Sequence, residues 1–140
     1  MKFRALAAAT ALVSGPVFAD GHAAGEAAFK QCQACHVVVD DDGNRIAGRA
    51  GRTGPNLFGL PGRQAGTVED FRYSNSLVDA GTGGLVWDEE TFVAFVMDPN
   101  TFLRETTGDN GARSKMSFKV RKEEDARNLY LFLESVSPAS

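Results

Sequence analysis

The chain has 140 residues, with 15 lysines and arginines against 18 aspartates and glutamates, and a formal net charge of -3. This length suits a single domain, and the acidic balance argues against a nucleic-acid-binding protein. No internal repeat is visible, and the only two cysteines are Cys32 and Cys35.

Residues 1–19 have the features of a secretory signal peptide. Lys2 and Arg4 precede an apolar run over 5–13, and small residues follow it. The run is too short to span a bilayer, which disfavours an uncleaved membrane anchor. We therefore expect cleavage after residue 19 and export to the periplasm. The domain that remains, residues 20–140, carries 13 bases and 18 acids, a formal net charge of -5.

The segment 32–36 reads C-x-x-C-H, which is the spacing of c-type haem attachment. A helix is expected to lead into it over 25–31. Positions i, i+3 and i+4 of a helical turn share one face, so Cys32, Cys35 and His36 would face the same way. Both thiols could then form thioethers with one haem, and the imidazole could coordinate its iron.

Other readings of the two cysteines are weaker. A zinc site would need more ligands than the motif itself offers. His22 could complete a set from the two cysteines and two histidines of the chain, but His36 directly after Cys35 makes poor zinc geometry. A thioredoxin-like pair would need a strand before Cys32, and none is expected. A disulfide suits an oxidising compartment, but thioethers would use both sulfurs. The acidic run 40–42 predicts an exposed turn, since the ligand spacing of a calcium loop is absent.

The next stretch, 53–63, is rich in glycine and proline, which excludes a regular helix or strand. We expect a shaped loop here, and a further loop over 71–74. Proline keeps its carbonyl oxygen, so Pro55 could accept the second N–H of the His36 ring and orient it.

Two helices are expected in the C-terminal half. Asp88 can cap the first, over 88–98, which Pro99 should end. Residues 101–114 are expected to be irregular. A final helix is predicted over 122–135, with acids in its first turn and an apolar stripe.

Met116 is the candidate for a second axial ligand of the iron. It lies among polar residues in a predicted loop, and its soft thioether suits iron. Met97 is the rival, but it lies on the 88–98 helix, away from the apolar stripe of Phe92, Phe95 and Val96.

These motifs in this order resemble a class I cytochrome c, most nearly the bacterial cytochrome c2 type. The resemblance covers essentially all of residues 20–140. It implies an all-α fold wrapped around one covalently bound haem, with crossing N- and C-terminal helices. The crossing is expected at Gly25 and Phe29, against Leu129 and Phe132.

The resemblance also implies roles for individual residues. His36 and Met116 match the axial iron ligands. The residues that match the haem environment are Pro55, which holds the histidine, Arg63, Tyr73 and Trp87 at the inner propionate, and Ser114. Three positions depart from the usual pattern: Phe95 replaces a tyrosine near the methionine, Phe132 replaces a frequent tyrosine, and Leu77 replaces a polar residue.

With both axial positions filled, outer-sphere electron transfer is expected rather than catalysis, so the chain should not be an enzyme. The resemblance implies a soluble carrier of single electrons. Its donor would be a membrane cytochrome bc-type complex, and its acceptor a photosynthetic reaction centre or a terminal oxidase. A haem enzyme or gas sensor, and a subunit of a larger complex, stay as alternatives. The pathway, whether photosynthesis, respiration or denitrification, stays open.

A basic surface for docking is expected around Met116. The segment 113–122 contains five bases and no acid, in an acidic protein. The candidate docking residues are Lys30, Arg113, Lys115, Lys119, Arg121 and Lys122. The alternative is an ordinary solvated face. A monomer is expected.

Overall fold

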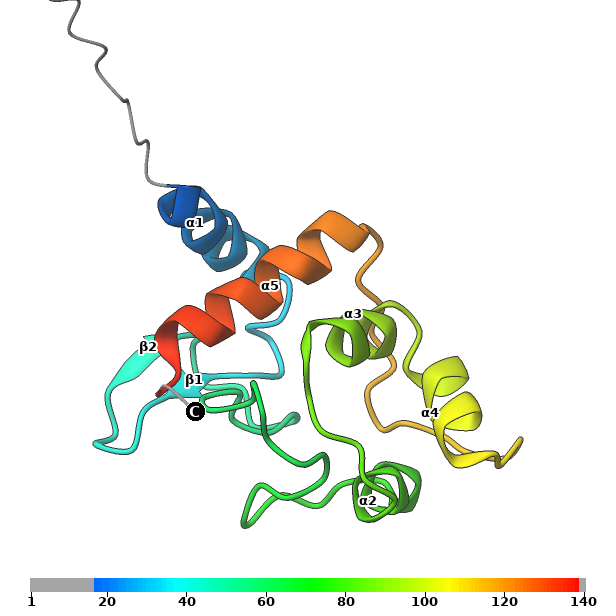
Figure 1. Ribbon diagram of the computed structural model, residues 1–140. Coiled ribbons are helices and arrows are strands. Elements are labelled where there is room, and N and C mark those ends of the chain that lie inside the picture. The colour runs from blue at the N-terminus through cyan, green and yellow to red at the C-terminus, as the bar shows by residue number, and fades with distance from the viewer. Residues whose placement is uncertain (1–16, 139–140) are drawn as a thin grey trace, which may run out of the picture.

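The computed structural model describes residues 17–138 (Figure 1). Five helices and one two-stranded hairpin follow each other in the order α1 Val17–Phe29, β1 Val38–Val39, β2 Arg45–Ala47, α2 Asn75–Thr82, α3 Glu89–Met97, α4 Pro99–Thr107 and α5 Glu123–Val136. The helical fold that the sequence predicts is confirmed. Residues 1–16 of the predicted signal peptide lie outside the described residues, and 17–19 are the first residues of α1.

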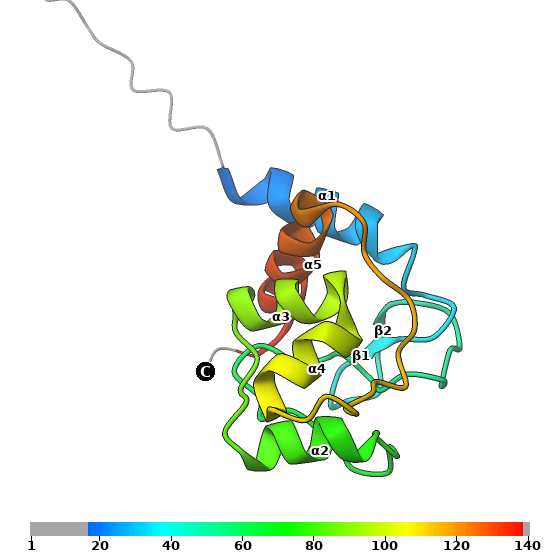
Figure 2. The same ribbon diagram turned by 90° about the vertical axis from the view of Figure 1, so that its right-hand side faces the viewer.

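The first and last helices, α1 and α5, cross (Figures 1 and 2), and Gly25 lies at the crossing, as predicted. A Cβ atom on Gly25 would lie 2.1 Å from the backbone oxygen of Asn128 and 2.5 Å from the Cβ of Phe132. The rings of Phe29 and Phe132 pack with centroids 6.0 Å apart. The absence of a side chain at Gly25 thus lets the two backbones meet.

Helix α3 packs against α5 and begins where the sequence predicts. The Asp88 carboxylate accepts a hydrogen bond from the backbone N–H of Thr91, and the Thr91 hydroxyl accepts one from the Asp88 N–H. This capping box fixes the start of the helix. Phe92 then packs on Tyr130 of α5, with ring centroids 5.7 Å apart.

The prediction that residues 101–114 are irregular is wrong for the first half of that range, because helix α4 runs from Pro99 to Thr107. Pro99 ends α3, as expected, but it also opens the next helix. A proline suits the first turn, where no backbone donor is needed. The Asp98 carboxylate caps α4 by accepting from the Thr101 N–H.

The sequence also missed two short elements, α2 and the hairpin. Helix α2 begins after Ser74, whose hydroxyl accepts from the Leu77 N–H. The hairpin β1–β2 encloses the predicted exposed turn. There the Asp40 carboxylate accepts hydrogen bonds from the backbone of Asp42 and from the backbone and side chain of Asn44. These short elements depend on local caps and leave little periodicity to detect.

Helix α1 also differs in extent from the predicted 25–31. It starts earlier and ends at Phe29, and the following residues form turns. The final helix lies within one residue of its prediction. Over 17–138, no helix is both long and apolar enough to cross a membrane.

The Gly25→Ala substitution should lower the free energy of unfolding by about 1–3 kcal/mol, because the new methyl group collides with backbone and core atoms of α5. Chemical denaturation measures the change. Gly21→Ala is the matched control in the same helix, since its Cβ would meet only the Leu131 Cδ1, at 3.6 Å. Equal stability in both variants would contradict this account of the crossing.

Candidate haem site

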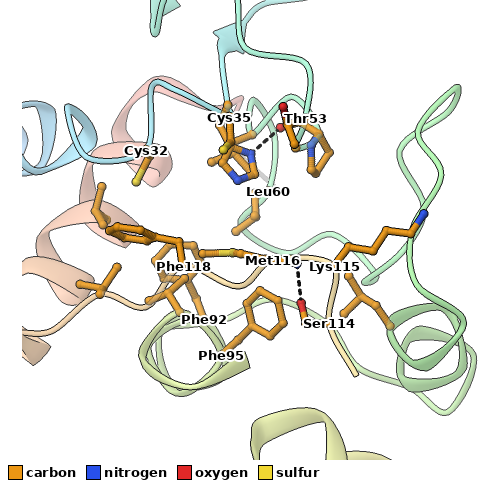
Figure 3. Close-up of a pocket in the computed structure, with 18 of the residues that line it drawn as sticks. Cys32, Cys35, Thr53, Leu60, Phe92, Phe95, Ser114, Lys115, Met116 and Phe118 are labelled. Carbon is orange, nitrogen blue, oxygen red and sulfur yellow. Dashed lines mark hydrogen bonds between the residues drawn. The ribbon is translucent and has the colours of Figure 1, made fainter. Parts of the chain in front are cut away.

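One apolar cavity lies between α1, α3, α5 and the loops, with about 1330 Å³ of space including its open mouth (Figure 3). Helix residues that also belong to the core, such as Phe29, Phe92 and Leu133, form part of its wall. Eight of the nine residues predicted to hold the haem and its iron line it: Cys32, Cys35, His36, Pro55, Tyr73, Trp87, Ser114 and Met116.

The cysteine motif is a single helical turn rather than part of a helix. The backbone N–H of His36 donates to the carbonyl oxygen of Cys32 at 2.9 Å, and that of Cys35 donates to the same oxygen at 3.1 Å. This turn places positions 32, 35 and 36 on one face, as expected. Both cysteines are free of disulfide bonds.

Burial, with a smaller contribution from Cys35, raises the pKa of Cys32 to about 11. A thiol that stays protonated at neutral pH is a poor metal ligand and a poor redox nucleophile. In the described part of the chain, no cluster of three or more His, Cys, Asp or Glu side chains could hold a metal ion. Helix α1, rather than a strand, leads into the motif. These observations disfavour the zinc and thioredoxin-like readings.

The imidazole of His36 is held as the sequence predicts. Its Nδ1 lies 2.8 Å from the Pro55 carbonyl oxygen, so Nδ1–H donates and Nε2 is left for a metal. Burial lowers the pKa of His36, and the bond to Pro55 opposes that shift. The ring is therefore in the neutral form that coordinates iron.

Glycines of the loop, for which the sequence predicts no role, allow it to approach the turn that carries Cys35 and His36. A Cβ on Gly54 would lie 2.2 Å from Cε1 of His36, and one on Gly51 would lie 2.8 Å from the Ala34 oxygen. The Gly54 N–H also donates to the Cys35 carbonyl oxygen, at 2.9 Å. The repeated glycines at 48, 51 and 54 were the available signal for such close approach.

Met116 enters the cavity from the opposite wall (Figure 3). The Ser114 hydroxyl accepts from its backbone N–H at 3.0 Å, and Asn100 accepts from the Ser114 N–H at 2.9 Å. The N–H of Val120 donates to the Val96 carbonyl oxygen at 2.8 Å. Met97 is packed against the core and is not part of the cavity lining.

The predicted haem-environment residues divide into two groups. Tyr73 and Trp87 line the cavity together with Phe95 and Leu77, two of the positions that depart from the usual pattern. Arg63 is not part of the lining, and its guanidinium donates to the Phe58 carbonyl oxygen at 3.0 Å.

The donor set fits a haem. Two thiols at the attachment spacing, an imidazole with Nε2 left for a metal and a thioether all reach one apolar space. An apolar cavity suits the porphyrin, and nitrogen and sulfur ligands suit its iron.

Known proteins similar to this chain are cytochromes c, although no family model matches the chain. Cytochrome c2 of Cereibacter sphaeroides is 51% identical over 142 residues, covering 98% of each chain. Cytochrome c-551 of Roseobacter denitrificans is 50% identical over 128 residues, covering 91% of this chain and 89% of that protein.

Solved structures agree. The crystal structure of cytochrome c2 from Rhodobacter sphaeroides has a TM-score of 0.82 and 52% identity, covering 85% of this chain and 98% of that one. Ferric cytochrome c-550 of Paracoccus versutus has a TM-score of 0.77 and 39% identity, covering 84% and 98%.

The chain belongs to the class I cytochromes c, of the cytochrome c2 type. The predicted fold class is thereby confirmed. Cytochromes c2 are electron carriers with covalently bound haem c, and Cys32 and Cys35 fit its attachment motif. The predicted cofactor is confirmed as well.

Substituting Gly54→Ala should displace the His36 ring, because the methyl group would overlap it. We expect a changed electron paramagnetic resonance spectrum of the ferric haem and a loss of about 1–3 kcal/mol in stability. Gly83→Ala is the control, since its Cβ would approach only to 3.3 Å of the Asp79 oxygen. An unchanged haem spectrum in Gly54→Ala would contradict the close contact.

Proposed function

We propose that this cytochrome carries single electrons in the periplasm, with His36 and Met116 as the two axial ligands of its haem iron. The observation that supports this best is that both side chains line the cavity that the two attachment cysteines also line. Bound there, the haem supplies a one-electron couple between ferric and ferrous iron.

The residues around the cavity favour electron transfer over catalysis. His36 and Met116 would fill both axial positions and leave none for a substrate. A thioether stabilises ferrous iron, which raises the reduction potential. The apolar wall excludes water and limits rearrangement when the charge of the iron changes.

The distal wall is more apolar than the resemblance alone implies. Phe95 stands where a tyrosine is usual, and its ring lies 5.2 Å from that of Trp87 and 5.8 Å from that of Phe102. No hydroxyl from this position can donate to the Met116 sulfur. The backbone of the loop that carries Met116 is held through Ser114 and Asn100.

For partners, we propose a cytochrome bc-type donor and a photosynthetic reaction centre or terminal oxidase as acceptor. The support is family membership, because several relatives carry the name cytochrome c2. We propose export through cleavage of residues 1–19 and a monomeric carrier.

Met116→Ala should remove the sulfur ligand, abolish the sulfur-to-iron charge-transfer absorption of the ferric protein and lower its midpoint potential. It should also open the ferrous iron to carbon monoxide, which the parent protein should bind poorly. Met97→Ala is the control, because Met97 is packed on the core outside the cavity lining. An unchanged charge-transfer band in Met116→Ala, or rapid carbon monoxide binding by the parent, would overturn the ligand assignment.

For docking, we propose the basic segment, residues 113–122, which carries the methionine. Its bases Arg113, Lys115, Lys119, Arg121 and Lys122 are all exposed. Phe118, which is 44% exposed, adds an apolar contact at the cavity rim. Basic side chains around an apolar centre suit an acidic partner surface.

The lysines of this segment are not equivalent. The Lys119 ammonium lies 2.9 Å from the Asp98 carboxylate, so part of its charge is compensated. That of Lys115 donates to the Arg72 carbonyl oxygen at 2.6 Å, which leaves its full charge at the rim. Lys30 lies apart from the segment's centre, in a groove that it shares with Lys122 and two acids of α5.

Lys115→Glu should therefore slow association with an acidic redox partner about three- to tenfold at low ionic strength and flatten the salt dependence. Stopped-flow kinetics over a salt series measures both. Lys119→Glu should have a smaller effect on steering than Lys115→Glu, since the charge of Lys119 is already paired.

Arg45→Glu is the control for net charge, because Arg45 is an exposed residue of β2, which lies at the left of Figure 1, away from the chain that leads into α5. Equal rates for Lys115→Glu and Arg45→Glu would show that only net charge matters and would overturn the proposed surface.

A further inference from the structure

We propose that Asp20, Gly21 and His22 form an amino-terminal binding site for Cu²⁺ or Ni²⁺ in the exported protein. The inference rests on the proposed cleavage after Ala19, which makes Asp20 the first residue and His22 the third. It is independent of the haem, of its ligands and of the docking surface.

A histidine at the third position of a free chain end has a specific chemistry. The terminal amine, the amide nitrogens of residues 21 and 22 and the imidazole Nδ1 can surround one metal ion in a plane, joined by fused chelate rings. Square-planar nitrogen coordination is the preference of Cu²⁺ and Ni²⁺ among the common divalent metals. Four metal–nitrogen bonds form, the two amide protons and any amine proton pass to the buffer, and no electron is transferred.

The imidazole of His22 is placed to serve in this way. Its side chain is 43% exposed, and its ring packs edge-on against Phe132, with centroids 5.2 Å apart. Nδ1, the nitrogen that the chelate requires, lies 2.7 Å from the Ser135 hydroxyl. Since that hydroxyl also donates to the Phe132 carbonyl oxygen at 2.7 Å, it stays satisfied when Nδ1 leaves. Nε2 lies 3.9 Å from Glu26, a carboxylate that favours bound positive charge.

The backbone of this segment can open at low cost. In a helix, the first four N–H groups have no partner within the helix. With Asp20 as the first residue, the amide nitrogens of residues 21 and 22 belong to that set. Gly21 is a poor helix former, and a Cβ there would touch only Leu131. The tight backbone approach of α1 to α5 lies at Gly25, beyond the three residues that would coordinate, and the contacts of Gly21 and His22 with α5 are to its side chains.

The site would lie apart from the haem. Cys32 follows His22 by ten positions of helix and turn, about 15 Å at the helical rise. The start of α1 lies at the outer edge of the molecule in both views (Figures 1 and 2). Metal binding there should leave the haem absorption spectrum unchanged.

The test uses the exported haem-containing protein and Cu²⁺ alone as the probe. Intact mass and amino-terminal sequencing identify the first residue. Calorimetric titration against a competing chelator then gives affinity and stoichiometry, and electron paramagnetic resonance of the copper counts its nitrogen ligands. We expect a chain that begins at Asp20, one Cu²⁺ per chain and hyperfine structure from four nitrogens.

Two variants separate this site from adventitious binding. His22→Ala should weaken Cu²⁺ binding by at least about 100-fold. A protein that retains Ala19 as its first residue keeps every later side chain but moves the histidine to the fourth position, and it should show a similar loss. Ser135→Ala should retain tight binding, because the hydroxyl only competes for Nδ1.

A first residue other than Asp20, or equal Cu²⁺ affinity in the parent, His22→Ala and Ala19-retaining proteins, would overturn the proposal. The haem spectrum and the midpoint potential, measured on the same samples, report on the proposed electron carrier separately. If Cu²⁺ does not bind as proposed, the haem measurements still test the proposed electron carrier. If the haem measurements contradict the electron carrier, the Cu²⁺ titration still tests the metal site.

Discussion

The contact between the His36 ring and the 53–63 loop is the constraint on which the site depends. The loop supplies a carbonyl acceptor at Pro55 and an empty space at Gly54, two residues that follow each other in the chain. The Pro55 carbonyl sets the orientation of the His36 ring, and the missing side chain at Gly54 permits the loop to approach it. Neither works without the turn that brings His36 next to the cysteines, so the proximal side is built by two short segments that position each other.

The opposite wall is held from the corner between α3 and α4. Three polar links join that corner to the segment that carries Met116: Val120 to Val96, Ser114 to Asn100, and Lys119 to Asp98. Asp98 has two tasks, since its carboxylate also caps α4. A single turn between two helices thus supports both the local fold and the placement of the sulfur. This is why α4, which the sequence did not reveal, matters for the site.

The sequence predicts most of what depends on spacing. The cysteine turn, the Pro55 acceptor and the Gly25 crossing agree with the structure. Met116, the methionine predicted as the iron ligand, lines the cavity and its rival Met97 does not. The errors of the prediction have local causes. A proline predicts the end of the preceding helix, but the first turn of a helix also accepts one, and Pro99 does both. The role of Arg63 at a propionate stays a prediction of the resemblance; in the structure its guanidinium donates to a carbonyl of its own loop.

The cavity wall and the hydrophobic core are largely the same residues. Phe29, Phe92 and Leu129 belong to the buried core and also line the cavity. Apolar surface that faces an empty space loses both its contacts and its shielding from water. The haem is therefore part of the core of this fold, and its apolar surface completes the packing of the helices. Cys32 and Cys35 fit the attachment motif of haem c. Thioether bonds from them would hold this part of the core covalently, which suits a protein whose iron changes charge while the haem stays bound.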